Sequence, residues 1–131
     1  MKTIIALYFA FVAIAAAQAQ ESKGLEEIVR KRDAVLTQIV EAIQSQYKAG
    51  KATGEQLRSA NINLYSFRRD TTKTQSERLQ WQERIVAAEK ERKASAKRHV
   101  ETGTVTRVDE LLAEERVLAA EQKLLELQAG K

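Results

Sequence analysis

Cysteine and proline are absent from this chain of 131 residues, glycine occurs five times, and aromatic residues make up 5% of the sequence. The absence of cysteine excludes disulfide bonds, which stabilise many small exported domains. Between the glycines the chain consists mainly of Ala, Leu, Glu, Lys, Arg and Gln, which are strong helix formers. We therefore predict an all-α protein whose stability comes from the packing of helices.

Residues 1–19 have the composition of a secretory signal peptide. Lys2 precedes an apolar run from Ile4 to Ala17, and Ala17-Gln18-Ala19 forms a small-x-small cleavage pattern. The alternative is a membrane anchor, but a spanning helix requires about 20 apolar residues, and this run is shorter. We expect cleavage after residue 19, which leaves one exported domain, residues 20–131, without a membrane span.

The charged residues of the remaining domain carry mixed signs. Lys2 is the one charged residue that cleavage removes, so the net charge falls from +4 to +3. Lys and Arg alternate with Glu along the chain, whereas nucleic-acid-binding proteins usually gather their basic residues on one surface. We therefore expect no nucleic-acid partner.

Apolar residues at alternating steps of three and four predict three helices, over residues 25–48, 54–102 and 107–128. Trp81 falls on the apolar seam, where it is a core residue or a partner contact. Residues 68–78 are polar even at the seam, and we interpret them as a wetter seam or an oligomer contact. Leu111, Leu118 and Leu125 lie beside the seam of the third helix and broaden it. The seam residues are Leu57, Ala60, Leu64, Phe67, Trp81, Ile85, Ala113, Val117, Ala120 and Leu124.

Two matching corners separate these helices. In each, a glycine follows the end of one helix, where a left-handed backbone conformation is common. A threonine three residues later caps the next helix, and a polar residue at its third position can bond back to the cap. The corners consist of Gly50, Thr53 and Gln56, and of Gly103, Thr106 and Asp109.

Short connections of this kind make the flanking helices antiparallel neighbours. The sequence therefore predicts an elongated antiparallel three-helix coiled coil, in which two consecutive helical hairpins share one long central helix. One chain leaves the side faces of such a rod uncovered. We expect a homo-oligomer or a partner protein to cover them.

The segment G-T-V-T-R-V-D-E-L-L-A, which begins at Gly103, resembles the "G-x-x-T/S-x-x-D-x-L-x-A" run of TolC-type outer-membrane efflux proteins. A weaker copy begins near Tyr47, and the resemblance covers residues 47–128. In that family the run opens a helix of a trimeric periplasmic tube, which meets an adaptor and an inner-membrane pump. The resemblance implies an envelope location, in the periplasm or at the outer membrane, and a structural or binding role in efflux or transport.

An enzyme is not expected. The single histidine, His99, stands among basic residues and is interpreted as solvated surface, and no group of residues has metal-ligand spacing. No catalytic residue, cofactor, metal or small-molecule substrate is predicted. The alternative function is a free periplasmic coiled-coil chaperone of the Skp kind, or a scaffold, with no transport role.

Overall fold

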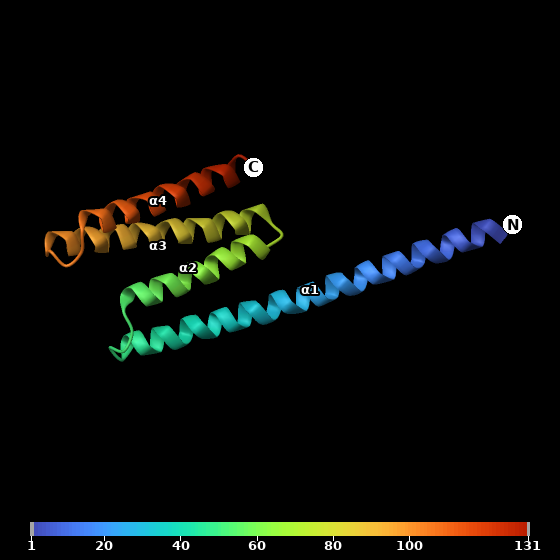
Figure 1. Cartoon of the computed structure of the whole chain (residues 1–131), viewed down its shortest axis with the longest axis horizontal. Coiled ribbons are helices and arrows are strands. Elements are labelled where there is room, and N and C mark those ends of the chain that lie inside the picture. Colours follow the sequence, from blue (N-terminus) through green and yellow to red (C-terminus); the bar gives the residue numbers. More distant parts are fainter. Residues whose placement is uncertain (1, 131) are drawn as a thin grey trace. The chain divides into compact units, whose positions relative to one another are not determined.

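The computed structural model describes the backbone of residues 2–130 and the side chains of residues 20–130. Over residues 2–130 the chain forms no strand and four α-helices (Figure 1): α1 (Lys2–Lys48), α2 (Gly54–Thr71), α3 (Gln75–Glu101) and α4 (Arg107–Gln128). The all-α prediction is confirmed. The predicted signal peptide, residues 1–19, lies outside the residues whose side chains are described.

The predicted continuous helix over residues 54–102 is divided into α2 and α3. Thr72 and Thr74 adopt extended backbone conformations, with ψ of 147° and 140°. The Thr74 hydroxyl accepts a hydrogen bond from the Glu77 backbone N–H at 3.3 Å and caps α3. Threonine side chains bond to nearby backbone groups and so favour helix ends over helix interiors. The polar segment 68–78 therefore contains a chain reversal, and two shorter helices replace the long central helix.

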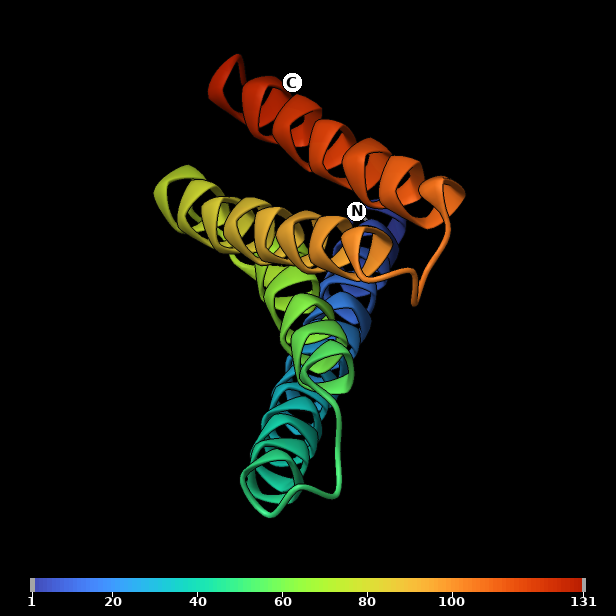
Figure 2. The same ribbon diagram turned by 90° about the vertical axis from the view of Figure 1, so that its left-hand side faces the viewer.

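The chain divides into an N-terminal unit that ends at Ala34 and contains only part of α1, and a second unit that begins at Val35. In the second unit α3 packs against both α2 and α4. Figures 1 and 2 show α3 between these two neighbours. Each connection is short, so successive helices run in opposite directions.

The predicted seam residues lie along these two helix contacts. Their steps of three and four residues place them on one face of each helix. Ile85 and Val86 of α3 form a buried cluster with Ala120 of α4. The buried seam residues are Ala60, Leu64, Phe67, Ile85, Ala113, Val117 and Ala120, and the half-buried ones are Leu57, Trp81 and Leu124.

Trp81 lies in an aromatic and cationic cluster between α2 and α3. Its ring stacks on Tyr65 with centroids 5.8 Å apart. The guanidinium groups of Arg68 and Arg84 lie 5.2 and 4.7 Å from the Trp81 ring centroid. Cation–π contacts of this length contribute about 0.5–1 kcal/mol each at exposed sites, so Trp81 helps to hold α3 against α2.

Three leucines of α4 are exposed, in contrast to the expectation that they broaden the seam. Leu111, Leu118 and Leu125 have exposed fractions of 48, 59 and 64%. Among the described residues, helix α4 packs against α3 alone, and Ala113 and Val117 are buried on that side. The leucines recur at seven-residue steps and share another face of α4, which we call the α4 leucine stripe.

Within residues 20–130, whose side chains are described, no helix is both long enough and apolar enough to cross a membrane.

Candidate functional site

The corner between α1 and α2 is built from a glycine and a capping threonine. Gly50 has a positive φ of 71°. Its N–H donates to the Tyr47 carbonyl, and the next N–H, that of Lys51, donates to the Gln46 carbonyl. These two bonds satisfy carbonyl groups that the end of α1 would otherwise leave unpaired.

Thr53 then begins α2 with a pair of reciprocal hydrogen bonds. Its hydroxyl accepts from the Gln56 N–H at 3.1 Å, and its own N–H donates to the Gln56 side-chain oxygen at 2.8 Å. A capping box of this kind satisfies two N–H groups at a helix start.

The corner between α3 and α4 repeats this geometry. Gly103 has φ of 72°, and the Thr106 N–H donates to the Asp109 carboxylate at 2.8 Å. The Thr106 hydroxyl lies 3.3 Å from the Asp109 N–H, from which it accepts a hydrogen bond. Both corners are thus built from local backbone chemistry, and they bring the first turns of α2 and α4 to the same groove.

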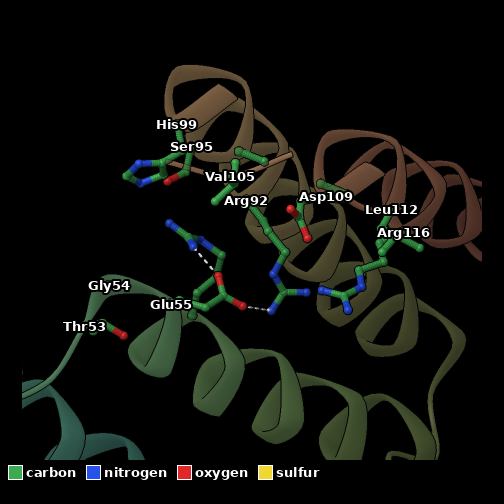
Figure 3. Close-up of a pocket in the computed structure, with 13 residues that line it drawn as sticks. Thr53, Gly54, Glu55, Arg92, Ser95, His99, Val105, Asp109, Leu112 and Arg116 are labelled. Carbon is green, nitrogen blue, oxygen red and sulfur yellow. Dashed lines mark hydrogen bonds and ion pairs between the residues drawn. The ribbon is translucent and has the colours of Figure 1, made fainter. Parts of the chain in front are cut away.

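This groove is a cavity of about 470 Å³ whose lining residues come from α2, α3, α4 and the two corners (Figure 3). Arg58, Arg92 and Arg116 enter it from three different helices. Glu55 and Asp109 supply carboxylates to the same lining. Charged side chains from three helices therefore meet in this groove.

Glu55 is the centre of the ion pairs in the groove. One of its oxygens lies 2.7 Å from Nη1 of Arg58, and the other lies 2.9 Å from Nη2 of Arg92. Figure 3 shows the Glu55 carboxylate pointing toward Arg92 across the groove. Arg92 also donates to the Ser59 hydroxyl at 3.0 Å. These contacts join the first turns of α2 to the second half of α3.

Arg92 has a second acidic partner, Glu89, one turn earlier on α3. The two carboxylate oxygens of Glu89 lie 2.9 and 2.8 Å from Arg92 Nη1. The Glu89 side chain is buried, with 8% exposed, and the Arg92 side chain is half-buried, with 12% exposed. The Nε atoms of Arg58 and Arg92 are buried without an acceptor. The cluster thus extends from the exposed Glu55 carboxylate to the buried Glu89 carboxylate, and its arginines have incomplete hydrogen bonding.

The surrounding groups shift the pKa of two carboxylates in this region. Partial burial alone would raise the pKa of Glu55, but hydrogen bonds and charge from Arg92 and Arg58 outweigh that effect and lower it. The hydrogen bonds from Thr106 lower the pKa of Asp109. Both groups therefore stay ionised at neutral pH, and the groove functions chemically as a region of ion pairing.

Ser95, His99 and Asp109 line the same groove without forming a hydrogen-bonded relay. The Nδ1 atom of His99 lies 3.1 Å from the Thr104 hydroxyl, and Asp109 bonds to Thr106. His99 is exposed. Within residues 20–130, no group of three or more His, Cys, Asp or Glu side chains is placed to hold a metal ion.

No protein-family profile, curated protein or solved structure matches this chain. Its function must therefore be inferred from its own residues and their arrangement.

Sequence reasoning missed the buried polar residues. Glu89 and Arg92 belong to a run of alternating charges, which is typical of a solvated helix face. Gln82 is the most buried residue of the described part, with 1% exposed. Its amide donates to the Ala120 carbonyl at 2.8 Å and accepts from Arg69 at 2.7 Å. One signal was present, because Gln82 and Glu89 are seven residues apart and share one face of α3 with Ile85.

Proposed function

We propose that this chain is an exported helical module of the cell envelope, which works by helix-to-helix association in a larger assembly. The α4 leucine stripe carries this proposal. Burying a fully exposed leucine contributes about 1.5–3 kcal/mol, so three half-exposed leucines offer roughly 3 kcal/mol to an interface. A row of large apolar side chains on one helix face favours a partner helix over solvent.

The type of assembly follows from the resemblance to the periplasmic tube of TolC-type efflux proteins. Two capped corners and antiparallel helices suit a wall made of packed helical hairpins. The charged groove fits a structural role, because its ion pairs join α2 to α3 and leave no paired nucleophile and base. We therefore propose a non-catalytic, structural or binding role in efflux or transport assembly, in the periplasm or at the outer membrane.

A periplasmic chaperone or scaffold of the Skp kind is the second candidate. The exposed apolar residues of α1, which include Leu25 and Ile28, favour it because unfolded clients are bound through apolar surface. In this function the chain would bind clients reversibly and would not need a fixed oligomeric state.

Light scattering on the protein recovered from an exporting host, expressed from the full sequence, separates these functions. Intact mass on the same sample is expected to show a chain that begins at Gln20. A helical trimer or larger oligomer is the expected result. A helical monomer at every concentration would refute assembly by self-association and would leave client binding, tested by suppression of aggregation.

A matched pair of variants connects the oligomer to the leucine stripe. Leu118→Gln removes an exposed leucine of the stripe and is expected to weaken association while helix content stays unchanged. Ala94→Gln changes an exposed residue of α3 and is expected to leave association intact. Equal effects of the two substitutions would show that the stripe is not the interface.

A further inference from the structure

Exposed apolar residues on α1 follow a regular pattern around one basic residue. Leu25, Ile28, Val35 and Ile39 are exposed by 43–64%. Arg32, which is also exposed, occupies the position between Ile28 and Val35. The five residues recur at steps of three, four, three and four, and so share one face of the helix. All five lie after residue 19 and would remain after removal of the predicted signal peptide.

An exposed face of α4 has the same spacing around an acidic residue, with three apolar residues and a glutamine at its last position. Val108, Leu111, Glu115, Leu118 and Gln122 also recur at steps of three, four, three and four. Val108 has an exposed fraction of 62%, and Glu115 is exposed. We call these two sets of five residues the α1 stripe and the α4 stripe. The central residue of the α4 stripe is the acid Glu115, whereas that of the α1 stripe is the base Arg32.

We infer that α1 of one copy packs in parallel against α4 of a second copy, with Arg32 and Glu115 in the same layer. In a parallel pair, residues at equivalent heptad positions face each other. The alignment places Ile28 opposite Leu111 and Val35 opposite Leu118. This inference rests on the proposed assembly function and names the surfaces that such an assembly would use.

The charges decide in favour of this pairing over the two symmetric alternatives. Two α4 helices paired in the same register would place Glu115 against Glu115, and two α1 helices would place Arg32 against Arg32. Like charges facing each other across an interface cost several kcal/mol. A polar or charged residue at a single seam position fixes register and partner choice, at some cost in stability.

The contact between two copies uses a different surface on each copy, α1 on one and α4 on the other. Each copy presents one α1 stripe and one α4 stripe, so a second copy bound through its α1 still offers its own α4. Head-to-tail contacts of this kind close into a ring if the rotation between copies permits, and otherwise continue as a filament. Such a ring agrees with the proposed tube-like assembly.

Charge reversal tests the pairing in the protein recovered from an exporting host. Arg32→Glu and Glu115→Arg, each alone, are expected to weaken self-association at least about tenfold, because like charges then meet in the seam. The double variant is expected to return to within about threefold of the original affinity, since the pair is restored with its signs exchanged. Arg30→Glu makes the same charge change at an exposed position outside the stripe and is expected to have little effect.

The result distinguishes this pairing from the proposed function. An oligomer whose affinity is unaffected by both single reversals, or not restored in the double variant, would overturn the pairing and leave the assembly function in place. A protein that does not associate at all would overturn both.

Cross-linking supplies a second test, because the chain has no cysteine of its own. Val35→Cys and Leu118→Cys are introduced in two chains of different mass, which are then mixed and oxidised. A mixed disulfide between the two chains is the expected product. Predominance of Leu118→Cys chains linked to each other would overturn the pairing in favour of α4 against α4.

Discussion

Removal of Arg92 alone should destabilise the second unit strongly. Its guanidinium is the partner of the Glu89 carboxylate, a side chain that is 8% exposed. In Arg92→Met that carboxylate stays buried without its cation, and breaking a buried pair in this way costs about 3–5 kcal/mol. Glu55 loses one ion pair but keeps Arg58, so the loss arises mainly at Glu89.

Replacement of both partners should have a much smaller effect. In the double variant Glu89→Leu, Arg92→Met both charges of the pair are removed, and apolar replacement of a buried ion pair is often neutral or stabilising by about 1–4 kcal/mol. The Arg92 Nε atom, buried without an acceptor, adds a reason, since its desolvation is not repaid in the native protein. The Glu89–Arg92 pair would then add little to the free energy of unfolding, and Arg92 would serve mainly to select which faces of α2 and α3 meet, through Glu55 and Ser59.

Urea unfolding followed by circular dichroism measures both effects. With a slope of about 1–3 kcal/mol per molar urea, the single variant should lower the midpoint by at least about 1 M or be unfolded in buffer. Lys97→Met removes an exposed cation of α3 and should change stability by less than about 0.5 kcal/mol. A single variant within 1 kcal/mol of the original protein, or a double variant as unstable as the single, would refute the reasoning.

Two further predictions concern the corners and acid stability. Gly103→Ala places a Cβ on a residue with φ of 72° and should destabilise the protein by about 1–2 kcal/mol. Gly24 lies inside α1, and a Cβ added there has no atom within 4 Å. Gly24→Ala should therefore stabilise the helix by about 0.5–1 kcal/mol. Thermal unfolding of both variants checks the pair, and effects of the same sign would contradict it. Ion pairs with Arg92 and Arg58 lower the pKa of Glu55 below the ordinary value of 4.5 despite the opposing effect of burial. The resulting stabilisation is present above pH 4.5 and is lost as the pH falls through the lowered folded-state pKa. The temperature of the thermal midpoint should therefore decrease as the pH is lowered below about 4.5. Glu55→Gln should be less stable at pH 7, and its midpoint should decrease less on acidification. An equally steep decrease in this variant would rule out Glu55 as the source.

The sequence predicted those parts of the structure that depend on local chemistry. A glycine that ends one helix and a threonine that caps the next one three residues later act through their own backbone and hydroxyl groups, and both such corners were placed from residue identity alone. Thr74 and Glu77 form a similar capping signal, but no glycine precedes them and the heptad spacing continues across them. The continuous spacing therefore predicted one helix, and the chain reversal at Thr72 to Thr74 was missed.

The groove could not be predicted, because its residues come together only through packing between helices. Glu89 and Arg92 have the local pattern of a solvated face, and their burial follows from the way α2 covers α3. Arg116 reaches the same groove from α4, twenty-four residues further along the chain. Local periodicity identifies which face of a helix is apolar, but it does not identify which polar residues a neighbouring helix will cover.

The chain reversal at Thr72 to Thr74 also has a consequence for the rate of folding. Because α3 packs on the helices immediately before and after it in the sequence, the contacts of the second unit join segments that are close along the chain. Helical proteins dominated by such local contacts fold in roughly microseconds to milliseconds. With this order of helices, each hairpin of the second unit can form as soon as its own two helices are available, without waiting for a contact from a distant part of the chain.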